Sequence, residues 1–152
     1  MSVGICTVTK VFLKSSPEYL PRLRTIVGCL ADGVGMDEQE ADDAKLAVTE
    51  VCVNAIRHGS PRGIEDSVSI EFTALGDTIT ANVTDCGGGI EYEASSDHSI
   101  LAGLGTQLIH KLTDSVCLTD NTSGLTVSLI KRAKNTPCLE NAIADPVGLH
   151  RN

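Results

Sequence analysis

Residues 83–90, VTDCGGGI, join the end of an expected strand to a run of three glycines. The segment that leads up to Asp85, TITANVT (78–84), alternates apolar and polar side chains, as does a strand with one buried face. Asp85 closes this strand, and the glycines remove every side chain from the backbone that follows. Such a run is compatible with a mobile turn or with close approach of a ligand to bare backbone. The aspartate makes the second interpretation worth pursuing, because a strand end can hold its carboxylate rigidly as a hydrogen-bond acceptor.

Length and composition limit the fold and the partners. The chain has 152 residues, a common size for one domain with its own core. Hydrophobic residues make up 41% and aromatic residues only 3%, so we expect an aliphatic core. The net charge of −8 argues against direct binding of nucleic acid, which is recognised largely through cationic surfaces. An acidic surface is instead suited to a basic patch on a protein partner.

Localisation is predicted from the N-terminus, the apolar runs and the cysteines. Residues 1–16 alternate in polarity and lack the apolar segment of a signal peptide. No apolar run approaches the roughly 20 residues that span a bilayer. Six cysteines lie singly without a CxxC pair, so we expect small buried side chains in a reducing compartment. The chain is therefore predicted to be cytoplasmic, without membrane contact.

Hydrophobic periodicity predicts a strand, two helices, two strands, a loop, a helix and two strands. Strands are expected over residues 5–13, 67–75, 78–85, 116–120 and 125–132. Helices are expected from Ser16 as N-cap, after Gln39, and over residues 105–116. Hairpins with grouped helices indicate an α+β sandwich, with a mixed, mostly antiparallel sheet and helices on one face. The domain is expected to span residues 1–132, and residues 133–152 to form a tail.

The second expected helix carries polar residues at a regular spacing within EVCVNAIRHG (50–59). Glu50, Asn54 and His58 lie four residues apart and therefore share one helical face. A solvated face is the simpler interpretation, but the flanking residues are apolar, which favours enclosure of the acid and the amide. A carboxylate can deprotonate a nucleophile. An amide oxygen is a hard ligand suited to Mg²⁺.

A second glycine-rich segment, GLGT (103–106), opens the third expected helix. Free N–H groups and the positive end of the helix dipole can bind a phosphate at such a point. The segment is neither a P-loop nor a dinucleotide fingerprint, because it lacks the Lys-Ser/Thr ending of the first and the spacing of the second. Each glycine cluster alone is weak evidence, so the information lies in the order of the segments.

In this order the segments EVCVNAIRHG, DCGGGI (85–90) and GLGTQLIHKLTDSV (103–116) resemble the nucleotide-binding boxes of the GHKL, or Bergerat-fold, ATPases. Within that histidine kinase-like superfamily the chain is most similar to the bacterial anti-sigma factor serine/threonine-protein kinases. PEYLPRLRTIVGCL (17–30) and SGLTVSLIKR (123–132) support this narrower resemblance. It covers roughly residues 5–132 and implies a Bergerat-type two-layer sandwich.

The resemblance implies roles for individual positions. Glu50 would be the catalytic base that activates a serine of the protein substrate, and Asn54 would hold Mg²⁺ against the phosphates of ATP. Asp85 would accept a hydrogen bond from the adenine amino group. Arg24 would contact protein partners, although an ordinary exposed arginine explains it equally well. The other nucleotide-binding positions would be Gly87, Gly89, Gly103, Leu104, Gly105, Thr106 and Thr126.

The implied function is that of an ATP-dependent serine-protein kinase and anti-sigma factor. An ATP-loaded homodimer would sequester a sigma factor and phosphorylate a STAS-domain anti-anti-sigma protein, in the mechanism called partner switching. The alternative is a regulatory module that binds ATP and its partners with little or no kinase activity. The catalytic part of a sensor histidine kinase fits less well, because the sequence shows no preceding dimerisation helix with a phosphoacceptor histidine.

The segment between the two glycine-rich stretches bears on these alternatives. EYEASSDHSILA (91–102) contains no lysine or arginine, whereas related kinases often carry a basic residue there to neutralise phosphate charge. His98 alone could help in this segment. Retention of Glu50 therefore favours the kinase, and the absence of a cation favours the binding module.

Overall fold

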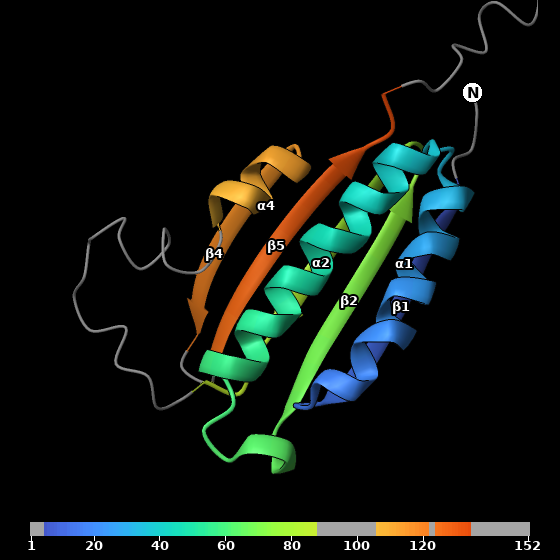
Figure 1. The fold of residues 1–152 in the computed structure, drawn as a ribbon. Helices are drawn as coiled ribbons and strands as arrows, with labels where there is room; N and C mark the ends of the chain where they lie inside the picture. The colour runs from blue at the N-terminus through green and yellow to red at the C-terminus, as the bar shows by residue number, and fades with distance from the viewer. Residues whose placement is uncertain (1–4, 88–105, 122–123, 135–152) are drawn as a thin grey trace, which may run out of the picture.

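The computed structural model describes residues 5–87, 106–121 and 124–134, which form two layers (Figure 1). One layer is a five-stranded sheet in the order β1-β2-β3-β5-β4. Its strands are β1 (Cys6–Lys14), β2 (Ser67–Leu75), β3 (Thr78–Thr84), β4 (Ser115–Asn121) and β5 (Gly124–Arg132). The four strand pairs are antiparallel, so the described part of the sheet contains no parallel pair.

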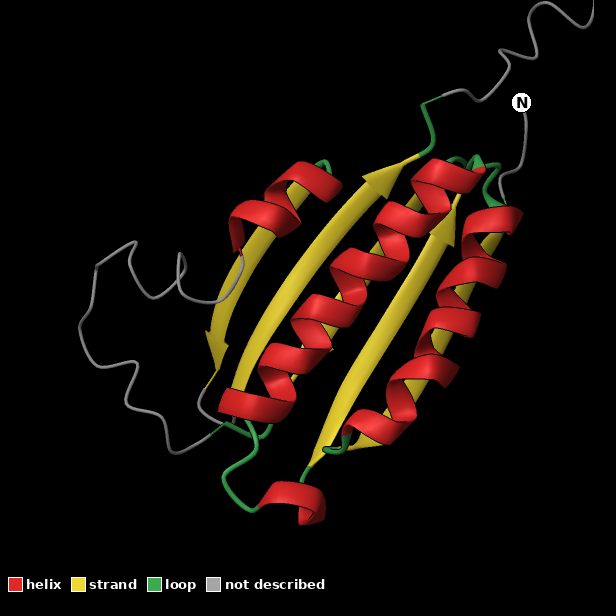
Figure 2. Ribbon diagram, in the orientation of Figure 1, coloured by secondary structure: helices red, strands yellow, loops and turns green. Residues whose placement is uncertain are grey.

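The second layer consists of helices that cover one face of this sheet (Figure 2). They are α1 (Leu20–Gly33), α2 (Glu38–His58) and α4 (Thr106–Leu112). Two short 3-10 helices, η1 (Pro17–Tyr19) and η2 (Gly63–Glu65), precede α1 and follow α2. The predicted α+β sandwich with helices on one face is confirmed.

The first α-helix begins later than predicted, because Pro21 cannot donate the backbone hydrogen bond that an α-helical first turn requires. Ser16 precedes η1 and makes no side-chain capping bond. Pro21 has no N–H group to donate to the carbonyl of Pro17, so the α-helical bond between them cannot form. The Leu20 N–H donates to the Pro17 carbonyl instead, which produces a 3-10 turn before α1.

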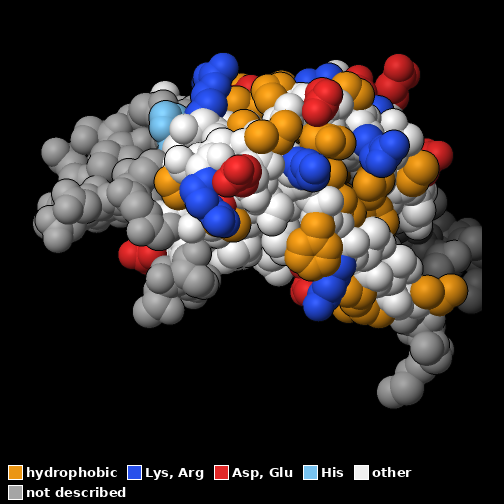
Figure 3. All heavy atoms as spheres, turned by 90° about the horizontal axis from the view of Figure 1, so that it is seen from below, with side chains coloured by type: hydrophobic (Ala, Val, Ile, Leu, Met, Phe, Trp, Pro, Cys, Tyr) orange, Lys and Arg blue, Asp and Glu red, His pale blue; other side chains and the backbone are white. Residues whose placement is uncertain are grey.

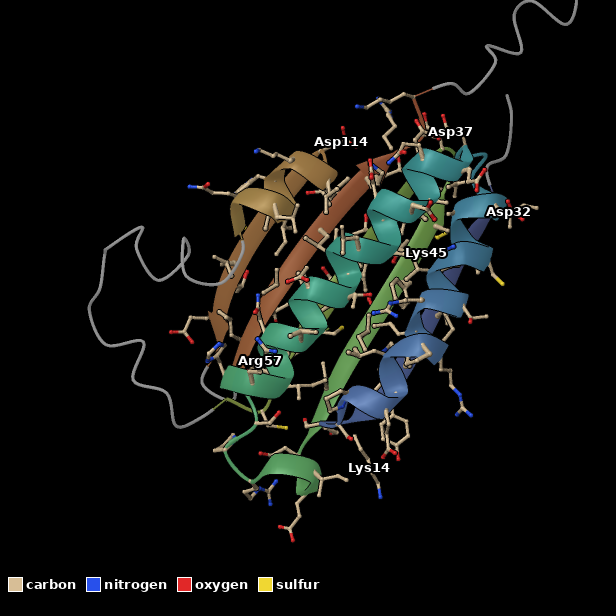
Figure 4. The ribbon with its side chains drawn as sticks, in the orientation of Figure 1. Lys14, Asp32, Asp37, Lys45, Arg57 and Asp114 are labelled. Atoms are coloured by element: carbon tan, nitrogen blue, oxygen red, sulfur yellow. The ribbon has the colours of Figure 1, made fainter. Side chains whose placement is uncertain are left out.

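The start of α2 is held by a capping box at Asp37, which is labelled at the upper end of this helix in Figure 4. The Asp37 carboxylate accepts from the Glu40 N–H at 2.8 Å, and the Glu40 carboxylate accepts from the Asp37 N–H at 2.9 Å. The second oxygen of Glu40 accepts from the Lys134 N–H at 2.7 Å. Ala133 is buried, so residues 133 and 134 pack against the domain although the predicted domain ends at residue 132. The boundary itself stays a prediction.

The prediction of a helix over residues 105–116 is wrong at its C-terminal end, because α4 ends at Leu112. The Leu112 carbonyl accepts from the Lys131 ammonium at 2.7 Å, and the Asp114 N–H donates to the Ile130 carbonyl at 2.8 Å. Both contacts come from β5, which is distant in sequence. They end the helix and start β4 at Ser115.

The core between the layers is aliphatic, as expected, and among the described residues Phe72 is its one fully buried aromatic side chain. Cys52 is buried there, and burial raises the pKa of its thiol to about 12. The prediction of buried cysteines is wrong for Cys6, Cys29 and Cys117, which are exposed and unpaired. On the strands, Cys6 and Cys117 occupy the alternate positions that point away from the helices.

The sheet face opposite the helices has no covering layer among the described residues. It exposes Val8 and Phe12 of β1 beside many threonines and serines. Seen from the η2 end, the surface mixes hydrophobic side chains with charges of both signs (Figure 3). None of the helices in the described ranges is long and apolar enough to cross a membrane.

Candidate functional site

A pocket lies between α2, α4 and the sheet, on the face that the helices cover. Asn54 and Asp85 contribute its polar groups, so the structure brings together two predicted site residues from separate elements. Most of the lining is aliphatic, which suits a flat apolar ring with a few directed hydrogen bonds. The other lining residues are Val51, Ala55, Val83, Ile109, Val116, Leu118, Leu125 and Val127.

Asp85 is buried where β3 ends, and its two carboxylate oxygens have different surroundings. Oδ1 accepts from the backbone N–H groups of Gly87 and Leu125, each at 3.0 Å. The Asp85 N–H in turn donates to the Leu125 carbonyl at 3.1 Å. Within the described ranges no donor reaches Oδ2. One oxygen therefore fixes the side chain, and the other receives no hydrogen bond from the described residues.

Three glycines leave room for Asp85. A methyl group at Gly59 or Gly87 would overlap its carboxylate, and one at Gly124 would overlap its carbonyl oxygen. Gly87 was predicted as part of the site, whereas Gly59 and Gly124 were not. Gly59 follows the last residue of α2, and Gly124 opens β5 after the hairpin from β4. Neither position in the sequence reveals a contact with Asp85, which is distant along the chain.

The polar stripe of α2 is only partly enclosed. Glu50 and Asn54 are half-buried, and Asn54 lines the pocket. His58 is exposed in the last turn, next to Arg57, which lies at the lower end of α2 in Figure 4. The acid and the amide, for which enclosure was predicted, are therefore partly enclosed, and the histidine is not.

Thr126 is not brought to the pocket by its side chain. Leu125 and Val127 line the pocket, so the intervening residue points to the opposite face of the sheet. There its hydroxyl is hydrogen-bonded to that of Thr84 at 2.9 Å. Strand alternation, already visible in LTVSL, was the signal that would have excluded an adenine contact by this side chain.

Arg24 lies outside the pocket, on the exposed side of α1. Its Nε donates to the Thr49 hydroxyl at 3.4 Å, across the contact between α1 and α2. It also lines a separate surface groove between these helices, together with Asp32 and Lys45. Both of these residues are labelled in Figure 4, where Lys45 lies on the side of α2 that faces α1.

The loop after α2 is fastened next to the pocket. Asp66 is buried and accepts from the Arg62 N–H and Nε, each at 2.8 Å. These bonds lower the pKa of Asp66, first through the backbone N–H and then through the guanidinium. The Cys86 thiol donates to the Ser67 carbonyl at 3.2 Å, which ties the residue after Asp85 to the start of β2.

Several predicted positions cannot be placed. Gly89, His98, Gly103, Leu104 and Gly105 lie outside the described residues. Thr106 is the first residue of α4, and three residues later Ile109 lines the pocket, so this helix begins close to the site. Among the described residues no three His, Cys, Asp or Glu side chains form a metal cluster. Asn54 carries an amide oxygen of the kind that can coordinate Mg²⁺.

Comparison with known proteins shows the family of this chain. Residues 13–131 match the profile of the histidine kinase-like ATPase domain. The chain belongs to this family. Within it, the chain groups with the serine-protein kinases named RsbW. The serine-protein kinase RsbW of Bacillus subtilis (strain 168) is 30% identical over 129 residues, which span 77% of this chain and 80% of the relative. RsbW of Staphylococcus epidermidis is 29% identical over 142 residues, with 85% and 89% covered.

Solved structures of this family share the fold. The RsbU and RsbW domains of a Mycobacterium tuberculosis protein superpose with a TM-score of 0.62 at 17% identity, covering 83% of this chain and 32% of that one. The histidine kinase domain of a blue-light activated kinase from Erythrobacter litoralis gives 0.54 at 21% identity, with 86% and 65% covered. These likenesses show that the two-layer fold is shared.

Proposed function

We propose that this protein is a cytoplasmic, ATP-dependent serine-protein kinase that also acts as an anti-sigma factor. The observation that carries the proposal is the carboxylate of Asp85, whose Oδ1 is fixed by two backbone donors while its Oδ2 has none among the described residues. A rigid acceptor beside aliphatic walls suits the amino group and ring of adenine. The RsbW relatives of Bacillus subtilis and Staphylococcus epidermidis are named serine-protein kinases, and these names supply the reaction class.

The nucleotide would be held by three groups of residues. Asp85 accepts from the adenine amino group, and aliphatic residues such as Val83 and Val127 cover the ring. Asn54 supplies an amide oxygen to Mg²⁺, which when bound neutralises phosphate charge. The backbone over residues 103–106, where α4 begins, binds the phosphates. These groups, a carboxylate, aliphatic side chains, an amide oxygen and backbone N–H groups, are of the types that bind ATP and Mg²⁺.

Glu50 is the catalytic base in this proposal. It lies one turn before Asn54 on α2, so both side chains project from the same side of the helix. Its carboxylate takes the proton of the substrate serine while the serine oxygen bonds to the terminal phosphorus of ATP and the bond to ADP breaks. General-base assistance of this kind contributes roughly 10²- to 10⁴-fold in rate.

The reaction is tested with labelled nucleotide. The protein is incubated with γ-labelled ATP, Mg²⁺ and each STAS-domain protein of the same genome. Glu50→Gln should lower the rate of label transfer by about 100-fold or more without changing ATP affinity. Glu65→Gln, an exposed acid in η2, should behave as wild type. Binding of ATP without transfer to any candidate would overturn the kinase and leave the binding module, which the cation-free segment 91–102 favours.

Partner binding is tested separately on α1. We propose that Arg24 contributes to docking of a sigma factor and of the STAS-domain protein on a homodimer. Arg24→Ala should weaken capture of the cognate sigma factor, measured by fluorescence anisotropy in the presence of ATP. Arg22→Ala is the matched control, since it is also exposed and lies two residues away on the same helix. Equal loss in both variants would contradict a specific role for Arg24, and sedimentation measures the dimer directly.

A further inference from the structure

Gly59 ends α2 in a conformation that does not require glycine. Its φ of −108° and ψ of 13° are accessible to any residue. Its N–H donates to the Ala55 carbonyl at 2.9 Å, as an ordinary helix C-cap does. The obstacle to a side chain here is instead the carboxyl group of Asp85, which an added methyl would overlap. The glycine therefore provides space for Asp85 and not backbone freedom.

Neither partner in this contact can move away without breaking hydrogen bonds. Asp85 is held on one side by the N–H groups of Gly87 and Leu125. The segment after Gly59 is also held, because the Ser60 hydroxyl donates to the Ala55 carbonyl and contacts the Ser15 hydroxyl at 2.6 Å. A methyl group at residue 59 would therefore displace the Asp85 side chain from its present rotamer or open the end of α2.

We propose that Gly59 is a positioning residue that sets the depth of the Asp85 carboxylate and thereby the preference of the pocket for adenine. This inference rests on the proposed function, in which Asp85 binds the base. The atom that a methyl group at residue 59 would approach most closely is Oδ2 of Asp85, the oxygen without a donor among the described residues. A side chain at residue 59 would move the oxygen that the adenine amino group needs, while the aliphatic walls of the pocket remain.

The first experiment measures nucleotide selectivity. Gly59→Ala and wild type are titrated with ADP and with inosine diphosphate, whose ring bears a carbonyl where adenine bears an amino group. The variant should lose about tenfold or more in ADP affinity and much less in inosine diphosphate affinity. Gly33→Ala is the control, because a methyl there meets no neighbouring atom and the residue lies in the last turn of α1. Unchanged selectivity, or an equal loss for both nucleotides, would overturn the inference.

The second experiment tests the contact without any nucleotide. Unfolding in urea is measured for Gly59→Ala, Asp85→Gly and the double variant. If the methyl acts through Asp85, Gly59→Ala should destabilise the wild-type background and cost clearly less in the Asp85→Gly background. Additive losses would refute the contact, and the double variant keeps the test valid if Gly59→Ala alone fails to fold. Failure of wild type to bind ADP would instead refute the proposed function and the ligand role of Gly59, whatever the unfolding data show.

Discussion

Replacement of Asp85 by asparagine changes one functional group in the pocket while preserving its shape. Both groups that face Oδ1 are N–H donors, from Gly87 and Leu125, so the amide oxygen of the asparagine will occupy that position. The amide NH₂ must then take the position of Oδ2. An acceptor for the adenine amino group thereby becomes a donor, and two donors face each other in the proposed complex.

The expected loss follows from this exchange. A hydrogen bond to a charged acceptor contributes about 1.5–3 kcal/mol, and leaving donors unpaired in an enclosed site adds about 1 kcal/mol or more. A total of roughly 2.5–4 kcal/mol corresponds to a rise in Kd for ADP of about 70- to 900-fold. The free energy of unfolding should change by no more than about 1 kcal/mol, because both backbone donors keep an acceptor.

Isothermal titration with ADP measures the affinity, and urea unfolding measures the stability. Asp120→Asn is the matched control, since this exposed carboxylate on β4 lies outside the pocket. Inosine diphosphate should lose far less affinity than ADP, because its carbonyl can accept from the new amide. An unchanged Kd for ADP in Asp85→Asn would refute the assignment of this side chain to the base.

Three further predictions concern stability and reactivity. Phe72→Ala removes a fully buried ring and should lower the free energy of unfolding by about 3–5 kcal/mol, measured in urea. Hydrogen bonds from Arg62 lower the pKa of Asp66 in the folded protein. The stability that this carboxylate contributes is therefore present above the unfolded pKa of 3.8 and is lost as the pH falls through the folded pKa. Asp66→Asn should flatten the acid limb of a plot of unfolding free energy against pH below about pH 4. In iodoacetamide labelling at about pH 8, exposed Cys29 should react in the native protein and Cys52 only after unfolding, because burial raises the thiol pKa of Cys52 to about 12. An unfolding free energy of wild type that does not fall at acid pH would contradict the prediction for Asp66. Labelling of Cys52 in the native protein would contradict the prediction for the cysteines.

The sequence predicted the elements whose signals are local. Strand β2 has the predicted bounds, and Gly76 and Asp77, which separate the two strands expected over 67–75 and 78–85, form a two-residue hairpin loop with Gly76 at a φ of 61°. Alternation along a strand and turn chemistry act between neighbouring residues, so they can be read without a fold. The position of Asp85 at a strand end, and of Asn54 on a helix, followed from the same local patterns.

Only the tertiary structure decided which residues meet. The early end of α4 depends on Lys131, and the exposure of Cys117 depends on which sheet face the helices cover. The need for glycine at residue 59 depends on a carboxylate from another element, because the backbone of Gly59 is conformationally ordinary. The sequence by itself determined the local elements and the residue types of the pocket. Packing between segments distant along the chain determined its walls and the orientation of Asp85, since such contacts leave no periodic trace in the sequence.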